Sequence, residues 1–268
     1  MWLGFLTTLI STVILGYFTI PLLQKLKFGQ TVRDDGPQSH LKKMGTPTMG
    51  GLFFLLPALI FSMVFSSDLA LLFPMILAIF GFGVVGFIDD FIKIRKQSKD
   101  GFSVLGKTIA LLFVCSAFAY YWVYHTPQGN EMLLPFTGMT ETLVIPSWIY
   151  MLFLILFLYL ISNSVNLSDG VDGLCSSVTI FVLLFFLITS QLINGTATIG
   201  VLILSLVGAL LGFLVFNVHP AKVFMGDVGS LALGGAVGII AIGMKIPWII
   251  LIVGIIYALE ALSVILQV

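Results

Sequence analysis

Charged residues are scarce in this chain of 268 residues: Asp, Glu, Lys and Arg make up 9% of it, whereas about a quarter is usual in soluble domains. Cysteine is almost absent too. Cys115 and Cys175 both lie in or beside apolar runs, which excludes a disulfide framework or a cysteine metal site and predicts small buried side chains. Hydrophobic residues reach 59% and the mean hydropathy is +1.15. This composition indicates a membrane protein.

Long apolar runs separated by short polar breaks predict membrane-spanning helices. A helix needs about 20 apolar residues to cross a bilayer. The runs are continuous and do not alternate, which argues against a β-barrel. We predict an all-α, polytopic integral membrane helical bundle that forms a single domain, residues 1–268. Its nine spans are expected at 2–23, 50–66, 69–88, 108–124, 147–162, 174–190, 197–216, 229–244 and 247–268. No basic residue precedes the first run, so we expect a true span and not a signal peptide.

Basic residues fall on one side of the predicted membrane. Eleven of the twelve lie in the breaks at 24–49, 89–107, 163–173 and 217–228, and only Lys245 lies on the other side. The positive-inside rule makes these four breaks cytoplasmic and places the N-terminus outside. The cytoplasmic breaks therefore carry the candidate chemistry.

Two adjacent acids, Asp89 and Asp90, end the third predicted span in the segment GFIDDFIK. Neighbouring carboxylates repel each other unless positive charge lies between them. Adjacent residues of a helix point about 100° apart, so the two acids can serve different roles, and Lys93 lies on the same face. A solvated helix end with an ion pair is the alternative interpretation.

Amides and acids recur at every third position after the fifth predicted span. They are Asn163, Asn166, Asp169 and Asp172, in the segment NSVNLSDGVDG. If the helix continues through them, they form one polar stripe that leaves the membrane. Such a stripe could bind a sugar, a ribose or a hydrated magnesium ion. A polar helix cap followed by a turn is the alternative.

The break before the eighth predicted span, FNVHPAKVFMGDVGS, combines an amide, an aromatic ring and an acid between two glycines. A helix N-terminus with nearby Gly and Ser attracts phosphate oxygens. Asp227 beside such a terminus suggests magnesium bridging a carboxylate and a phosphate. Phe224 could stack on a nucleobase, although membrane packing is the commoner use of such a ring.

The first cytoplasmic break ends in HLKKMGTPTMGG, residues 40–51, where lysines precede Gly and Thr. These residues could hold a phosphate, although their order does not form a Walker A loop. A positive-inside anchor is the alternative. Glu260 falls inside the ninth predicted span, and acids at such depth are usually paired or functional.

Together and in this order, the segments HLKKMGTPTMGG, GFIDDFIK, NSVNLSDGVDG and FNVHPAKVFMGDVGSLALGG resemble the phospho-N-acetylmuramoyl-pentapeptide transferase family. That family is a branch of the polyprenyl-phosphate N-acetylhexosamine-1-phosphate transferase superfamily, and the resemblance covers residues 17–268. It implies transfer of phospho-MurNAc-pentapeptide from UDP-MurNAc-pentapeptide to undecaprenyl phosphate, which gives lipid I and UMP. The reaction would take place at the cytoplasmic face of the bacterial inner membrane and use Mg²⁺. The resemblance is compatible with a homodimer, and we expect no nucleic-acid partner.

The resemblance also assigns roles to individual residues. It makes Asp89, Asp90 and Asp227 the catalytic acids, with Asp227 as the magnesium ligand. The positions that match substrate-binding residues are Lys43, Thr48, Lys93, Lys107, Asn163, Asn166, Asp169, Asp172, Asn217 and Phe224. Among these, Phe224 is the ring expected beside uracil.

The chain departs from the family pattern at its end. The family continues with a cytoplasmic loop that bears a histidine cluster and with a tenth span, whereas this sequence stops at Val268. We therefore expect residues 1–268 alone to be inactive or nearly so. Two other functions compete: a sibling transferase that uses UDP-GlcNAc, and a secondary transporter, which would place ionisable groups near mid-bilayer.

The predicted topology can be tested by cysteine labelling. A cysteine at Ser39 or Ser98 should react with an impermeant thiol reagent only after the membrane is opened, because both positions lie in cytoplasmic breaks. A cysteine at Thr137 should react in intact protoplasts. The reverse labelling pattern would overturn the topology.

Overall fold

Helices dominate the computed structural model, which describes residues 2–25, 45–96, 101–127, 129–135, 137, 141–193 and 196–267. The predicted all-α class is confirmed. The elements, in chain order, are α1 (Trp2–Lys25), α3 (Gly51–Val64), α4 (Leu69–Lys96), α5 (Val104–His125), β1 (Glu131–Leu133), β2 (Thr142–Val144), α6 (Ser147–Leu167), α7 (Leu174–Thr189), α8 (Ala197–Asn217), α9 (Gly226–Gly243), the 3-10 turn η1 (Pro247–Ile249), α10 (Ile250–Val253) and α11 (Ile255–Gln267).

Each predicted span coincides with a helical segment, but not all of these segments are long enough to count as spans. In the described part of the chain, six helices are long and apolar enough to cross a membrane: α1, α4, α5, α6, α8 and α9. A bent pair at the C-terminal end raises the number to seven if it is one span. Helices α3 and α7, of 14 and 16 residues, fall short of the roughly 20 that a span needs. The count of nine and the outward N-terminus stay predictions.

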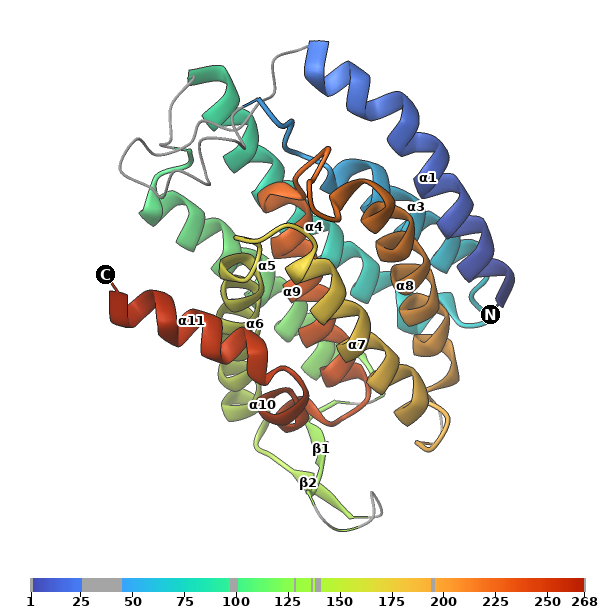
Figure 1. The fold of residues 1–268 in the computed structure, drawn as a ribbon. Coiled ribbons are helices and arrows are strands. Elements are labelled where there is room, and N and C mark those ends of the chain that lie inside the picture. The colour runs from blue at the N-terminus through green and yellow to red at the C-terminus, as the bar shows by residue number, and fades with distance from the viewer. Residues whose placement is uncertain are drawn as a thin grey trace.

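The last predicted span, 247–268, is not one continuous helix. The segments Pro247–Val253 and Ile255–Val264 meet at an angle of 73°, and Gly254 lies at the break. Figure 1 shows α11 running across the bundle and not along it. The buried Tyr257 fixes this direction, because its hydroxyl lies 2.8 Å from the Thr179 hydroxyl of α7. Continuous hydropathy therefore hid a break that a single glycine permits.

Helix α9 forms the centre of the bundle. Its residues from Val228 to Gly243 are all buried, and it packs against α3, α4, α6 and α7. Small side chains make this possible. A Cβ at Gly51 of α3 would lie 2.7 Å from the Gly229 Cα, and one at Gly234 would lie 2.6 Å from the Ser162 Cα of α6. Glycine at these points lets helix backbones approach closely, as is common between helices in membranes.

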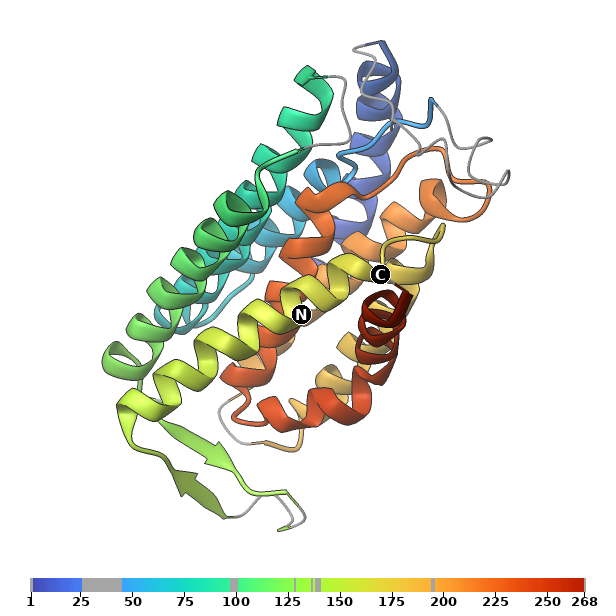
Figure 2. The same ribbon diagram turned by 90° about the vertical axis from the view of Figure 1, so that its left-hand side faces the viewer.

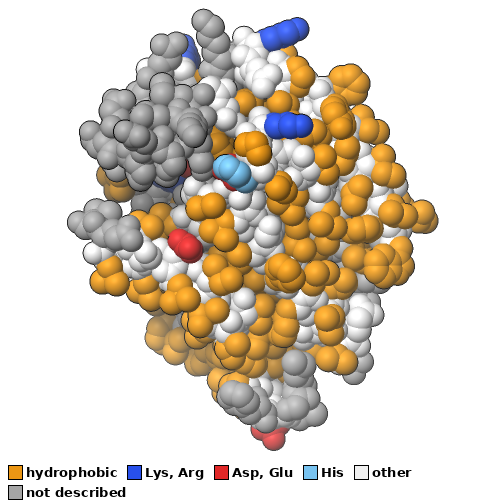
Figure 3. Space-filling model, viewed as in Figure 1, with side chains coloured by type: hydrophobic (Ala, Val, Ile, Leu, Met, Phe, Trp, Pro, Cys, Tyr) orange, Lys and Arg blue, Asp and Glu red, His pale blue; other side chains and the backbone are white. Residues whose placement is uncertain are grey.

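The two ends of the bundle differ. At one end lie the end of α4, the segment 45–50 and the connection from α8 to α9, and at the other end lies the antiparallel hairpin of β1 and β2 (Figures 1 and 2). The hairpin, which the sequence did not predict, is held by Lys245, whose ammonium group lies 2.6 Å from the Glu131 carboxylate. On the face shown in Figure 3, the Lys, Arg and His side chains lie in the upper part, and hydrophobic side chains cover a broad belt below. Both cysteines are buried and free, as predicted.

Candidate functional site

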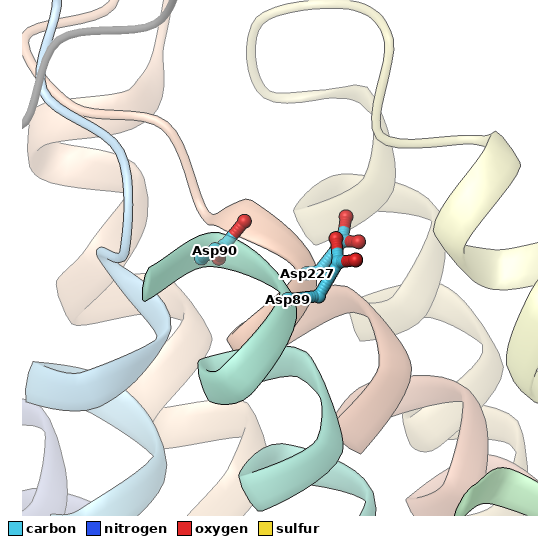
Figure 4. Close-up of side chains that lie close together, drawn as sticks. All are labelled: Asp89, Asp90 and Asp227. Carbon is cyan, nitrogen blue, oxygen red and sulfur yellow. The ribbon is translucent and has the colours of Figure 1, made fainter. Parts of the chain in front are cut away.

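Three carboxylates from two helices meet at the polar end of the bundle. Asp89 and Asp90 lie near the C-terminal end of α4, which continues to Lys96, and Asp227 is in the first turn of α9. One oxygen of each carboxylate lies within 4.8 Å of the others. Figure 4 shows Asp89 and Asp227 side by side, with Asp90 pointing in another direction from the same turn of α4. The expectation that adjacent acids of one helix point apart therefore agrees with the structure.

A glycine one turn before the acids lets the two helices come so close. At Gly86, a Cβ would overlap the carbonyl carbon and oxygen of Asp227 and the amide nitrogen of Val228. These are backbone atoms, so no rotation of a side chain could relieve the overlap. The direct contact between the backbones of α4 and α9 thus sets the distance between Asp89 and Asp227.

Two lysines hold the carboxylates together. The Lys93 ammonium group lies 2.5 Å from Oδ2 of Asp89 and 3.2 Å from Oδ2 of Asp227. The Lys107 ammonium group, from the first turn of α5, lies 2.6 Å from the same Asp227 oxygen. With all five groups ionised, three negative charges face two positive ones. Because the Asp89 and Asp90 side chains are almost wholly buried, water can offset little of the remaining repulsion.

Backbone amides fix the two acids of α4. Oδ1 of Asp89 accepts a hydrogen bond of 2.8 Å from the amide of Phe102, in the turn before α5. Oδ2 of Asp90 accepts one of 3.2 Å from the amide of Val228 in α9. Asp90 thus joins α4 to the start of α9, whereas Asp89 joins α4 to α5 and faces the lysines.

Asn166, in the last turn of α6, is the third partner of Asp227. Its Nδ2 donates to Oδ1 of Asp227 at 2.9 Å and to the hydroxyl of Ser230 at 2.7 Å. The asparagine therefore lies in the acid cluster, where the resemblance expected a substrate-binding residue.

The glycine-rich segment before α3 is hydrogen-bonded to the loop before α9. The Phe224 amide donates to Pro47 O at 2.8 Å, and the amides of Gly50 and Gly51 donate to Phe224 O and Met225 O at 2.9 and 2.8 Å. We call these three backbone bonds the strap. It places Thr48 beside the acid cluster, since a Cβ at Gly226 would lie 2.8 Å from the Thr48 hydroxyl.

Asn217 lies beneath the same loop. Its side chain is buried and holds the protein together: Nδ2 donates to Val223 O at 3.0 Å, and Oδ1 accepts from the amide of Gly173 at 3.1 Å. The Ser176 hydroxyl is a further donor to Oδ1, at 3.4 Å. These contacts join the loop that carries Phe224 to the start of α7.

The polar stripe expected if the helix continued after α6 is not helical throughout, so that interpretation is wrong; the alternative, a helix end followed by a turn, agrees with the structure. Helix α6 ends at Leu167, so Asp169 and Asp172 lie in the turns before α7. Oδ2 of Asp172 lies 3.0 Å from Nδ1 of His219 and accepts a hydrogen bond of 3.2 Å from the amide of Ala221. Asn163, inside the helix, donates to Tyr159 O. The helix therefore ends before the three-residue spacing can continue, and Gly173, with φ +74°, lies just before α7.

The structure thus brings Asp89, Asp90, Asp227, Lys93, Lys107 and Asn166 into one cluster, with Thr48 beside it. Asp172 and Phe224 belong to the neighbouring loops, and Asn217 is the last residue of α8. Lys43 lies outside the described residues. Sequence reasoning missed two residues: Gly86 and Ser230. Each lies three positions from an acid on the same helix, so the face of the helix was the available signal.

The carboxylate cluster is chemically suited to a magnesium ion. Magnesium prefers oxygen ligands and is commonly held by one or two carboxylates together with substrate phosphates. Oδ2 of Asp227 already faces two cationic groups in this structure. Asp89, Asp90 and Asp227 are the three side chains whose carboxylate oxygens could hold a metal ion.

Comparison with known proteins defines the class of protein first. The family model described as glycosyl transferase family 4 matches residues 72–245, which include the helices that carry the acid cluster. With its bundle of apolar helices, the chain is thus a multi-pass membrane protein of the phosphosugar transferase class.

Curated relatives named phospho-N-acetylmuramoyl-pentapeptide-transferase identify the family more closely. The relative from Acetivibrio thermocellus is 47% identical over 264 residues, 98% of this chain and 79% of its own length. The relative from Clostridium novyi is 45% identical over 267 residues, 98% of this chain and 80% of its own length. The relative from Caldanaerobacter subterraneus subsp. tengcongensis is 44% identical over 256 residues. The chain belongs to the phospho-N-acetylmuramoyl-pentapeptide transferase family, so the resemblance stated from the motifs is confirmed.

The close approach at Gly86 can be tested by substitution. Gly86→Ala should lower activity at least about tenfold, because moving α4 away from α9 shifts Asp89 relative to Asp227, and misplacement by about 1 Å can cost 100-fold. Gly81→Ala is the matched control on α4, since its Cβ would meet only the Val114 side chain, at 3.1 Å. Equal activity of the two variants would contradict this account of the spacing.

Proposed function

We propose that this chain transfers phospho-MurNAc-pentapeptide from UDP-MurNAc-pentapeptide to undecaprenyl phosphate, with release of UMP. The observation that carries the proposal is the cluster of three acids and two lysines at one end of an apolar bundle. One substrate is soluble and the other stays in lipid, so a site at the membrane surface can reach both. We further propose that this surface is the cytoplasmic face of the bacterial inner membrane.

Both reactants are anions, so the site must offset charge and align them. Lys93 and Lys107 are the groups that would meet the phosphates, since both ammonium groups are partly exposed beside Asp227. Mg²⁺, when bound by Asp227 and Asp89, would supply further positive charge to the pyrophosphate oxygens. Asp90 and Asn166 would keep the start of α9 and the Asp227 carboxylate in place.

Direct attack by the acceptor phosphate fits the contacts of Asp89 better than attack by a carboxylate. One Asp89 oxygen accepts from the Phe102 amide and the other lies 2.5 Å from the Lys93 ammonium group, so neither is a free nucleophile. A phosphate acceptor is largely ionised near neutral pH, because its second pKa is about 6. In this mechanism an acceptor oxygen bonds to the phosphorus that carries the sugar, the bond to the bridging oxygen breaks, and UMP leaves.

The nucleotide side of the site is proposed around the strap. Phe224 is half-buried and would stack on uracil, and Thr48 and Lys43 would contact the polar part of the donor. Asn217 would support the loop that carries Phe224 without contacting the nucleotide, because its side-chain amide is hydrogen-bonded to Val223 and Gly173. Asn163, Asp169 and Asp172 would line the side toward the sugar.

The substrate pair provides the direct test. A version of the protein that carries the C-terminal tail of a close relative should, with undecaprenyl phosphate and Mg²⁺, form a labelled lipid from UDP-MurNAc-pentapeptide and release UMP. It should form none from UDP-GlcNAc. Lipid formation from UDP-GlcNAc instead would favour the sibling transferase. The relatives' shared name favours neither that sibling nor a transporter.

Removing the charge of Asp227 should stop turnover. In a version that carries a relative's C-terminal tail, Asp227→Asn keeps the shape of the side chain but loses the charge that faces Lys93, Lys107 and the proposed ion, so the rate should fall more than about 100-fold. Nucleotide binding should change less. A rate within tenfold of the unsubstituted protein would refute the metal assignment.

Phe224→Ala should have the complementary effect. Loss of a stacked ring should weaken nucleotide binding by about 1–3 kcal/mol and leave the rate at saturating nucleotide much less affected. Calorimetry with UMP, beside turnover at high donor concentration, measures both quantities. An unchanged UMP affinity would remove Phe224 from the nucleotide site.

A further inference from the structure

The amide group of Asn166 lies between two acceptors, and each takes one of its hydrogens. One hydrogen goes to Oδ1 of Asp227 and the other to the hydroxyl oxygen of Ser230. A primary amide has two hydrogens on one nitrogen, so two acceptors on different sides fix the plane of the group. If Asp227 were the only acceptor, the amide group could rotate about its one hydrogen bond to that carboxylate.

Ser230 can act only as an acceptor toward Asn166. Its hydroxyl hydrogen is donated to Gly226 O, one turn earlier in α9, at 3.1 Å. A hydroxyl has one hydrogen, so its lone pairs are what remain for the amide. Ser230 is fully buried, and water does not compete for this bond.

The packing of α6 on α9 keeps this arrangement in register. The two helices approach closely where Gly234 meets Ser162, because a Cβ at Gly234 would lie only 2.6 Å from the Ser162 Cα. Asn166 follows Ser162 by one turn, and Ser230 precedes Gly234 by one turn. Because the neighbouring helices run in opposite directions (Figure 1), these two residues face each other at the same level.

The arrangement divides the two oxygens of Asp227 between different tasks. Oδ1 is held by Asn166, whereas Oδ2 faces the ammonium groups of Lys93 and Lys107. We infer that Ser230 is a positioning residue: by fixing the Asn166 amide it orients the Asp227 carboxylate so that a single oxygen, Oδ2, is presented to a bound divalent cation. The inference takes from the proposed function both the role of Asp227 as a metal ligand and the identity of the reaction that the cation serves.

The test is binding of Mn²⁺, followed by electron paramagnetic resonance on the protein in detergent, without substrates. Groups that orient a metal ligand typically contribute 10–100-fold to metal affinity, so Ser230→Ala should weaken Mn²⁺ binding by about tenfold. Ser230→Cys, which keeps the volume but is a poor acceptor, should weaken it similarly. Ser230→Thr, which keeps the hydroxyl, should stay near the unsubstituted protein, and UMP affinity should not change in any of the three.

Ser62→Ala is the matched control. Ser62 is also fully buried in a helix and also donates to a backbone carbonyl, Leu59 O, but it belongs to α3. Its loss should leave Mn²⁺ binding unchanged, and melting temperatures of all variants separate loss of fold from loss of orientation. Unaltered Mn²⁺ affinity in Ser230→Cys, or no Asp227-dependent Mn²⁺ binding in the unsubstituted protein, overturns the inference. Failure of the proposed function looks different: Mn²⁺ binds as expected but no lipid product forms.

Discussion

Repulsion among Asp89, Asp90 and Asp227 is the constraint on which the rest of the site depends. Three carboxylates within 4.8 Å of one another, two of them almost wholly buried, are stable only with positive charge among them. Lys93 supplies it from the same helix, and Lys107 supplies it from α5. The need for charge balance therefore ties together α4, α5 and α9, which hydrophobic packing alone would allow to slide.

The distances between the helices, in contrast, are set by glycines, which have no side chain. Gly86 brings the α4 backbone onto Asp227, Gly51 brings α3 onto Gly229, and Gly234 brings α6 onto α9. Lipid tails are as apolar as the side chains, so moving an apolar side chain from lipid into a helix interface gains little free energy. Close van der Waals packing therefore contributes much of the free energy of helix association. The acid cluster thus stands on a rigid framework, where its geometry is least sensitive to thermal motion of long side chains.

Much of this could be predicted from the sequence, and the failures have physical causes. Among the residues that the structure describes, each apolar run found from hydropathy coincides with a helical segment, because a bilayer favours long apolar helices. The pairing of Lys93 with Asp89 followed from helical spacing. The helical stripe through Asp172 failed because α6 ends at Leu167 and turns follow it, and the bend at Gly254 was hidden within continuous hydropathy. The role of Ser230 could not be foreseen, since it depends on the register between two helices far apart in the chain.

The strap has a consequence for how such a site can vary. Its bonds join main-chain atoms of Pro47, Gly50 and Gly51 to those of Phe224 and Met225. Apart from the amides lost to proline and the close approaches at Gly50 and Gly51, main-chain bonds are largely indifferent to side-chain identity. Related chains can therefore exchange the side chains that project from these two loops while the path of both loops stays the same. The side chains that recognise a donor can then change, in evolution or by design, without a change in the backbone of the two loops.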